Sequence, residues 1–254
     1  MFKLVESEKE IKKVRTFCSQ GYFGARINTA IAAYGTDDRF VRTWFEESDD
    51  KVLAVMQLTE GAAVVKCRPE ADFVSLAMLL QFAGAKTVIG DRDSVGRLPF
   101  SVSAQGVLME CRTLPDLACE ALAVDSEQLA SLYPVLFGEE AAEKDKRAFH
   151  AWFADISHRV RHGFCECFAV YENEVAVSCA SVLYSNAQYG CIGAVATRPE
   201  HRSRGFGRDC ALAATKRVLE NGQLACLACA DSGIHQWYEA MGFAVAGEWA
   251  KLLV

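Results

Sequence analysis

Hydrophobic positions alternate in some segments of the chain and recur at helical spacing in others, and they give the two halves of the sequence the same order of elements. In the first half, Ser7-Glu8-Lys9-Glu10 has the capping-box form that precedes a helix. A short turn at Glu60-Gly61 separates two alternating runs and predicts a hairpin. The elements expected here are a helix from Ser7 that stops at Gly21, a helix over Arg26–Tyr34, strands over Lys51–Leu58 and Ala62–Cys67, a helix from Pro69 through Leu79 that ends at Gly84, and strands at 87–89, around Phe100 and at Val107–Cys111.

The second half repeats this order after a mixed segment at Thr113–Ala118. Helically spaced apolar residues come first, and alternating runs separated by Glu172-Asn173 follow them. A strand then leads through an arginine-rich loop into a helix that Asn221-Gly222 ends. The expected elements are helices over Ser126–Phe137 and Glu140–Arg161, strands over Cys165–Tyr171, Val175–Tyr184 and Gly190–Thr197, a helix over Gly205–Glu220, a strand over Leu224–Ala230, a helix over Ile234–Met241 capped by Asp231-Ser232 and closed by Gly242, and a strand over Glu248–Val254.

The repetition predicts two similar α+β units, residues 1–115 and 119–254, each with a mixed sheet flanked by helices. The strand that begins at Ala62 corresponds to the one that begins at Ile192. A strand followed by a helix and a second buried strand is a crossover unit, which makes the two strands parallel. The first crossing runs through Arg68-Pro69-Glu70-Ala71-Asp72 and contains no glycine, whereas the second contains two.

The composition argues against bulk electrostatic binding. The chain has 254 residues, of which 51% are hydrophobic and 24% charged, and its formal net charge is −6. An acidic protein of this kind has no general affinity for nucleic acid or for an anionic membrane. No apolar run reaches the roughly 18 residues of a membrane span, and the N-terminus has no secretory signal. We therefore expect a cytoplasmic protein without nucleic-acid or membrane partners; the sequence is compatible with a homodimer.

The eleven cysteines are scattered through apolar stretches. Their odd number and irregular spacing suit a reducing compartment rather than a disulfide framework. Cys226 and Cys229 would point to opposite faces of a strand, and Cys165 and Cys167 have no second ligand pair nearby. Buried thiols that pack as small hydrophobes are therefore favoured over a metal site, and we expect no metal.

The segment from Arg198 to Arg208 combines four arginines with two glycines at the start of an expected helix. In open α/β sheets, ligands bind at the carboxyl ends of strands, against helix N-termini whose backbone N–H groups lack partners. Gly205 and Gly207 let an anion approach the backbone. Four arginines against the single Glu200 leave a local positive excess, which suits a multiply charged phosphate. The alternative is an exposed basic turn before an ordinary helix.

Two motifs together resemble the GNAT superfamily of acyl-CoA N-acyltransferases. Arg202-Ser203-Arg204-Gly205-Phe206-Gly207 is similar to their Arg/Gln-x-x-Gly-x-Gly/Ala motif. Trp237-Tyr238-Glu239-Ala240-Met241-Gly242-Phe243 resembles their late Leu-Tyr-x-x-x-Gly-Phe signature, and the approach Val195–His201 also looks like theirs. The resemblance covers roughly Ala121–Val254 and departs from the family at Asp231 and Ile234, where asparagine and alanine are frequent.

The resemblance implies a GNAT-like fold in two tandem units, with acetyl-CoA as co-substrate of the second unit. We expect no cofactor binding in the first unit, because its crossover lacks glycine and contains Pro69 instead. It implies that backbone groups of the strand end hold the pantetheine arm and polarise the thioester carbonyl. It also implies that amides from Arg202 to Gly207 hold the pyrophosphate and that Tyr238 faces the sulfur as the candidate acid. The cofactor-binding residues carried over in this way are Val195, Ala196, Thr197, Arg202, Ser203, Arg204, Gly205, Phe206, Gly207 and Arg208.

The implied reaction is acetyl transfer to a primary amine of a small molecule or peptide by direct attack. A lysine-like amine costs about 4.6 kcal/mol to deprotonate at neutral pH, so a base should help. Glu166 is the candidate base, because it shares a strand face with Phe168 and Val170 and apolar neighbours raise the pKa of a carboxyl. A solvent-exposed glutamate is the alternative for Glu166, and a core residue is the alternative for Tyr238.

Two other functions stay open at this point. A non-catalytic acyl-CoA sensor would keep the loop and lack the chemistry, and the presence of Tyr238 favours the enzyme over it. A nucleotide-binding module of different chemistry would bind ATP or NAD more tightly than acetyl-CoA.

Overall fold

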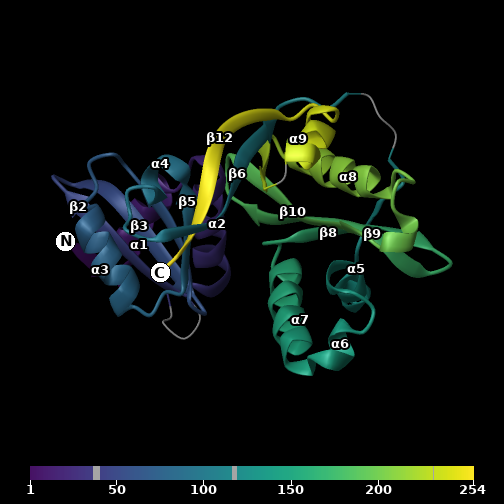
Figure 1. Ribbon diagram of the computed structural model, residues 1–254, viewed down its shortest axis with the longest axis horizontal. Helices are drawn as coiled ribbons and strands as arrows, with labels where there is room; N and C mark the ends of the chain where they lie inside the picture. The colour runs from purple at the N-terminus through teal and green to yellow at the C-terminus, as the bar shows by residue number, and fades with distance from the viewer. Residues whose placement is uncertain (37–40, 116–118, 231) are drawn as a thin grey trace. The chain divides into compact units, whose positions relative to one another are not determined.

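The computed structural model describes residues 1–36, 41–115, 119–230 and 232–254 (Figure 1). They form two compact units that interleave along the chain. Unit 1 comprises Met1–Glu110, Ala228–Glu239 and Ala244–Val254, and unit 2 comprises Cys111–Leu227 and Ala240–Phe243. Each of the units expected from the sequence, 1–115 and 119–254, is one continuous stretch of the chain. The compact units are not continuous, because the C-terminal strand belongs to unit 1.

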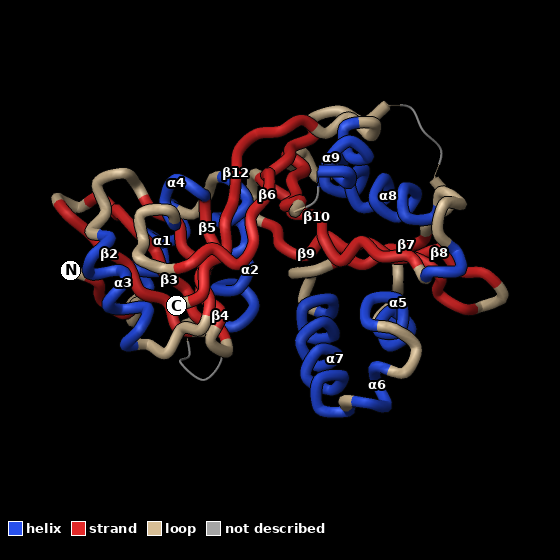
Figure 2. The backbone as a smooth tube through the Cα atoms, viewed as in Figure 1, coloured by secondary structure: helices blue, strands red, loops and turns tan. Residues whose placement is uncertain are grey.

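Unit 1 is a mixed sheet covered by helices on its faces (Figure 2). Its strands lie in the order β1-β2-β3-β4-β5-β12-β6. The expected parallel crossover is confirmed, since β4 pairs parallel with β5. Its elements are β1 (Phe2–Leu4), α1 (Glu8–Phe17), α2 (Gly21–Tyr34), β2 (Arg42–Ser48), β3 (Lys51–Thr59), β4 (Ala62–Cys67), α3 (Phe73–Phe82), β5 (Thr87–Asp91), α4 (Arg92–Val95), β6 (Ser101–Cys111), α9 (Ser232–Glu239) and β12 (Ala244–Leu253).

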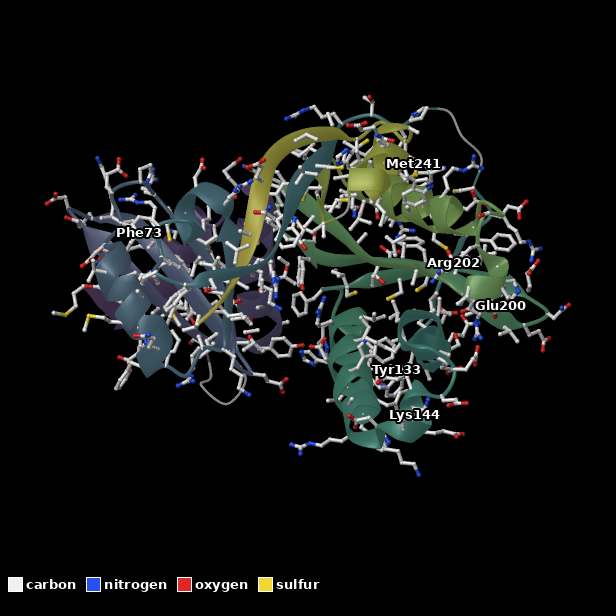
Figure 3. All side chains as sticks on the ribbon, viewed as in Figure 1. Phe73, Tyr133, Lys144, Glu200, Arg202 and Met241 are labelled. Carbon is white, nitrogen blue, oxygen red and sulfur yellow. The ribbon has the colours of Figure 1, made fainter. Side chains whose placement is uncertain are left out.

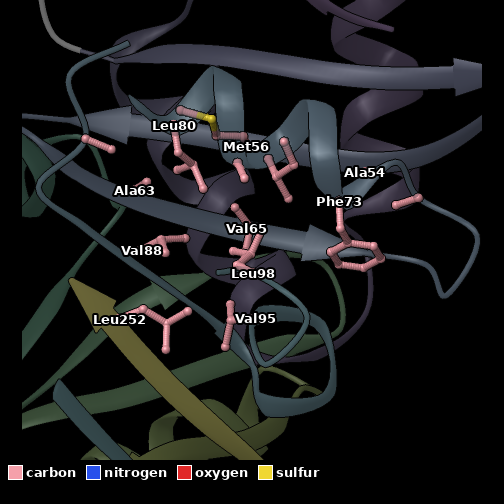
Figure 4. Packing of buried hydrophobic residues seen from close by; sticks show 14 of the residues in the cluster. Ala54, Met56, Ala63, Val65, Phe73, Leu80, Val88, Val95, Leu98 and Leu252 are labelled. Atoms are coloured by element: carbon pink, nitrogen blue, oxygen red, sulfur yellow. The ribbon is translucent and has the colours of Figure 1, made fainter. Parts of the chain in front are cut away.

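The core of unit 1 lies on both faces of this sheet. On one face, Leu76 and Leu80 of α3 pack against Met56, Val65 and Val88 of the strands (Figure 4). A second cluster joins α1 and α2 to the sheet residues Phe45, Val55 and Trp249.

The strands of unit 2 lie in the order β11-β10-β9-β8-β7. Helix α8 covers one face, and α5 and α7 lie on the other (Figure 2). Here too the crossover is parallel, between β10 and β11. The elements are β7 (Leu122–Ala123), the 3-10 helix η1 (Leu129–Ser131), α5 (Leu132–Phe137), α6 (Ala141–Lys144), α7 (Lys146–Arg161), β8 (Glu166–Glu172), β9 (Val175–Ser185), β10 (Tyr189–Thr197), the 3-10 helix η2 (Pro199–His201), α8 (Phe206–Glu220) and β11 (Leu224–Cys229).

The predicted α+β architecture is confirmed, but the strands expected around Phe100 and at Val107–Cys111 form the single strand β6, and several helix ends differ from those expected. The capping box forms at Ser7 and Glu10, but α1 ends at Phe17, and Gly21 begins α2 instead of ending α1. Close packing explains the second glycine of α2, because a Cβ at Gly24 would lie 2.5 Å from the carbonyl oxygen of Cys18.

The single helix expected over Glu140–Arg161 is two helices. The break falls at Asp145, whose carboxylate accepts a hydrogen bond from the N–H of Ala148 at 2.9 Å and so caps α7. The expected cap at Asp231 lies outside the described residues. Within the described part of the chain, each helix is too short or too polar to cross a bilayer.

The cysteines are mostly core residues, as expected. Nine are buried, and Cys67 and Cys119 are half-buried. Burial raises the pKa of the Cys18 thiol to about 12 and that of Cys210 to about 11, from an ordinary value of 9.0.

These thiols should make stability fall in alkaline solution. Their pKa is higher in the folded than in the unfolded protein, so their stabilising contribution is complete below pH 9.0 and is lost as pH rises through about 11 to 12. Urea unfolding under reducing conditions at increasing pH should show the midpoint falling above pH 9.0. The decline should be shallower in Cys18→Ala, and a midpoint that does not change with pH would refute the assignment.

Candidate functional site

Strand β10 contains a bulge in its second half. Gly193 pairs with Ser181 of β9, and Ala196 pairs with Cys179, so three steps along β10 oppose two along β9. Between them, Ala194 has a φ of 52°, which is rare for a residue with a side chain. A bulge of this kind interrupts the ladder and turns the backbone of Val195 away from regular pairing.

Strands β10 and β11 also separate. Their parallel pairing runs from Tyr189 and Leu224 to Cys191 and Cys226, whose Sγ atoms are 3.3 Å apart. Beyond this point β10 continues to Thr197, and none of its described residues pairs with β11. The edge of β10 therefore offers main-chain donors and acceptors to an extended ligand.

The loop after β10 ends in an uncapped helix N-terminus. Figure 3 shows Glu200 and Arg202 in the connection between β10 and α8. Gly205 adopts a φ of 91° at the N-cap, and no side chain caps the helix there. The N–H of Arg202, expected among the pyrophosphate-binding amides, instead donates to the carbonyl of Pro199 at 3.3 Å. Within the described part of the chain, the N–H groups of residues 203–208 have no protein acceptor. Unpartnered N–H groups at the start of a helix are able to bind an anion such as a phosphate.

Acidic residues from outside the loop neutralise much of its positive charge. Arg204 donates two hydrogen bonds to Glu172, at 2.5 and 2.7 Å, and Arg208 lies 3.5 Å from Asp209. The positive excess expected from the sequence is therefore overestimated. Arg202 donates to the carbonyl of Thr197 at 3.2 Å and is exposed; among the described residues it has no acidic partner. The groups in this loop that are not engaged by acidic side chains are therefore the backbone N–H groups and the side chain of Arg202.

Arg198 has a structural role that unit 1 repeats. Its Nε donates to the carbonyl of Ala176 at 2.6 Å, and it forms an ion pair with Glu139. In unit 1, Arg68 occupies the same place in an Arg-Pro-Glu turn, and its Nε donates to the carbonyl of Val52 at 3.1 Å. Both arginines fix the end of a strand to its neighbour, so Arg198 is not available to an anion.

Unit 1 lacks the bulge and the uncapped helix start of this site, although its parallel strands β4 and β5 also pair over only three residues, up to Val64 and Ile89. The pairing of β3 with β4 shows no register shift. Helix α3 begins at Phe73, three residues after Glu70, whereas α8 begins at Phe206, six residues after Glu200. The N-terminus of α3 is capped by Asp72, which accepts from the N–H of Ser75 at 3.0 Å. A carboxylate thus caps the start of α3, whereas no side chain caps the start of α8.

Tyr238 lies on α9, which belongs to unit 1. Its side chain is buried, and its ring packs edge-on against Trp237 with the centroids 4.8 Å apart. Burial raises the pKa of Tyr238 to about 12, with a smaller contribution from Cys229. The phenol is therefore protonated at every physiological pH and can donate a hydrogen bond.

Glu166 lies in different surroundings from those the sequence suggested. Its carboxylate forms an ion pair with Arg217 of α8, whose guanidinium covers the ring of Phe168. Glu166 and Arg217 line a pocket of about 310 Å³ at the C-terminal end of α8. Among the described residues, none of the segment 195–208 lines this pocket. Also among described residues, no group of three or more potential metal ligands occurs.

Ser178 is a site residue that sequence reasoning missed. Its hydroxyl donates to the carbonyl of Ala196 at 2.9 Å and lies 2.9 Å from the Thr197 hydroxyl, so it holds the strand just beyond the bulge. The sequence feature that could have indicated the bulge, and with it the residues that hold it, is Gly193, because a glycine inside a strand often marks a bulge. A Cβ at Gly193 would lie 2.5 Å from Leu183.

Comparisons with known proteins identify the family and the fold. Residues 119–252 match a family model described as GNAT acetyltransferase, and no curated protein matches the chain. The fold is similar to a tandem GNAT protein from the clavulanic acid biosynthesis pathway, with a TM-score of 0.65 and 13% identity over 100% of this chain and 98% of that one. It is also similar to a GNAT acetyltransferase from Colwellia psychrerythraea, with a TM-score of 0.62 and 13% identity over 100% and 99%. A GCN5-related N-acetyltransferase from Sphaerobacter thermophilus has a TM-score of 0.59 and 14% identity over 98% and 94%. At these identities the likeness shows a common tandem GNAT fold.

Proposed function

Because the chain belongs to the GNAT acetyltransferase family, we propose that unit 2 binds acetyl-CoA and transfers its acetyl group to a primary amine of a small molecule or peptide. The observation that carries the proposal is the pair of main-chain surfaces left without a partner: the edge of β10 beyond Cys191, where β11 no longer pairs, and the N–H groups of residues 203–208 at the start of α8. Acyl-CoA has a matching shape, with an extended amide-containing arm at one end and a pyrophosphate at the other.

Each part of the substrate has a counterpart in these residues. The N–H groups of residues 203–208 would hold the pyrophosphate, with Arg202 adding a positive charge at its side. The amides of the pantetheine arm would pair with the edge of β10 up to Thr197, as an added strand does. The N–H of Val195 beside the bulge would polarise the thioester carbonyl.

The proposed reaction needs no covalent enzyme intermediate. The neutral amine nitrogen attacks the thioester carbonyl, a C–N bond forms and the C–S bond breaks. The amine loses its proton to a base or to water, and the leaving thiolate accepts a hydrogen bond or a proton. Main-chain donors aimed at the developing oxyanion supply the largest contribution in acyl transfers of this type.

In this scheme Tyr238 acts mainly as a hydrogen-bond donor to the thiolate. With its pKa raised to about 12, full proton transfer to a thiolate of pKa near 8.5 is uphill by about 5 kcal/mol. A hydrogen bond to the thiolate avoids that cost and still stabilises the leaving group.

Unit 1 has no acyl-CoA site in this proposal. The regular β3–β4 ladder and the Asp72 cap on α3 support this assignment. One acetyl-CoA should therefore bind per chain, and isothermal titration should give a stoichiometry of one.

A second function, non-catalytic acyl-CoA binding, is favoured by the ion pair of Glu166 with Arg217, since it leaves the proposed base engaged. A screen of amines and peptides with acetyl-CoA distinguishes the two, with free thiol and product mass as readouts. The enzyme releases thiol and forms an acetylated product in equal amounts. Binding without either product supports the sensor, and thiol release alone indicates thioester hydrolysis.

Glu166→Gln tests the proposed base. If the carboxylate accepts the amine proton, kcat/KM at neutral pH should fall by at least about tenfold, and the acidic limb of the pH–rate profile should disappear. Glu220→Gln is the matched control, because Glu220 also lies close to Arg217, at 3.9 Å. Equal effects of the two substitutions, or an unchanged pH profile, would remove Glu166 from the mechanism.

A further inference from the structure

Helix α3 of unit 1 has an apolar outer face. Leu76 and Leu80 pack into the core, whereas Val74, Met78 and Phe82 are 74%, 66% and 91% exposed. These three residues, the α3 ridge, are four positions apart and form one line along the helix. None of the ten residues of α3 is charged. A helix that is apolar on both sides is typical of one that is covered on both sides.

The corresponding helix of unit 2 shows that this position in the fold does not require an apolar surface. Helix α8 also connects two parallel strands, yet its exposed side chains include Arg208, Lys216 and Glu220. The packing of a crossover helix on its sheet is therefore compatible with a charged outer face. The α3 ridge consequently indicates an interaction surface.

We propose that the α3 ridge binds the same ridge of a second copy of this chain, in a twofold antiparallel pair. Met78 is the middle residue of the ridge, so it would meet the partner's Met78 at the axis, and Val74 would meet the partner's Phe82. Ridges of residues four apart interdigitate when two helices cross at about −50°. Because α3 carries no charge, the pairing brings no like charges together, although the protein has a net charge of −6.

The size of the ridge sets the strength of the dimer. Three side chains of this exposure present apolar area on the order of 400 Å² per copy. A standard stable interface needs roughly 800 Å² per partner. The ridge is thus the apolar centre of a small interface, with Ser75 and Gln81 beside it as part of a polar rim. We expect a dissociation constant in the micromolar range.

Sedimentation analysis over a range of micromolar concentrations tests the proposal. The mass of the wild-type chain should rise from 27.9 kDa toward twice that value. Met78→Glu should weaken dimerisation by at least about a hundredfold, because two carboxylates would meet at the axis. Met78→Lys should do the same, whereas a mixture of the two variants should form a heterodimer. Leu122→Glu is the control, since Leu122 is also 66% exposed but lies in unit 2.

The mixing experiment separates a loss of pairing from a loss of folding. Thermal unfolding of each variant verifies that it is folded, and recovery of the dimer on mixing verifies that both surfaces are intact. A wild-type chain that stays monomeric at the highest concentration overturns the proposal. So does a dimer that Met78→Glu leaves unchanged, or a mixture of the charged variants that stays monomeric.

Discussion

Replacing Gly205 by valine should lower the affinity for acetyl-CoA by at least about a hundredfold. Gly205 adopts a φ of 91° at the start of α8, a conformation that a β-branched residue avoids. The substitution would therefore change the backbone of the loop and redirect the N–H groups that are proposed to hold the pyrophosphate. Isothermal titration with acetyl-CoA measures the loss directly.

Gly222→Val is the matched control for backbone strain. Gly222 follows the other end of the same helix, has a φ of 72°, and has open space around the position of a Cβ. This variant should lose stability in the same way and keep its affinity for acetyl-CoA. If Gly205→Val bound acetyl-CoA as tightly as Gly222→Val, the loop would not be the pyrophosphate site.

Tyr238→Phe should lower kcat by at least about tenfold and leave the dissociation constant of acetyl-CoA within about twofold. Removing the hydroxyl removes the proposed donor to the leaving thiolate, an interaction that is strongest in the transition state and weak in the ground state. The aromatic ring, which packs against Trp237, stays in place. Steady-state kinetics with an amine that the wild-type protein acetylates measures kcat, and titration with acetyl-CoA measures the dissociation constant.

Tyr133→Phe controls for the loss of a buried phenol in general. Tyr133 is 5% exposed and packs among aromatic rings, including Phe137 and Trp152, in unit 2. It should leave kcat unchanged. Turnover of Tyr238→Phe equal to the wild type would exclude Tyr238 from the chemistry, and a parallel loss of acetyl-CoA affinity would indicate a structural role.

The sequence predicts the loop because its backbone geometry depends on local residues. A left-handed conformation at a helix start favours glycine, and Gly205, which the sequence marks as a point where an anion can approach the backbone, adopts it. The sequence also predicts the crossover, since a strand, a helix and a buried strand follow one another directly. The β10–α8–β11 unit accordingly has the predicted parallel order.

The net charge of the loop cannot be predicted from its own sequence, because it depends on acidic residues that are distant along the chain. Glu172 lies 32 positions from Arg204 and takes both of its hydrogen bonds. Glu139 and Arg198 pair in the same way from separate segments. Counting charges along the chain therefore overestimates the part that arginine side chains can play in holding an anion.

The place of the last strand is also set by tertiary packing. Strand β12 pairs with β5 and β6, because Ala250 and Leu252 complete one core cluster of unit 1 and Trp249 completes another. Nothing in the alternation of a strand specifies which neighbours it takes. For a related reason the sequence pattern does not predict β2, since the polar residues Thr43 and Glu46 are buried in it and obscure its hydrophobic pattern.

A crystal structure of the protein grown with acetyl-CoA tests the central claim most directly. We predict that the pyrophosphate oxygens accept hydrogen bonds from N–H groups of residues 203–208, and that the pantetheine arm lies along β10 up to Thr197. A pyrophosphate bound anywhere else, including at the start of α3 in unit 1, would contradict the account.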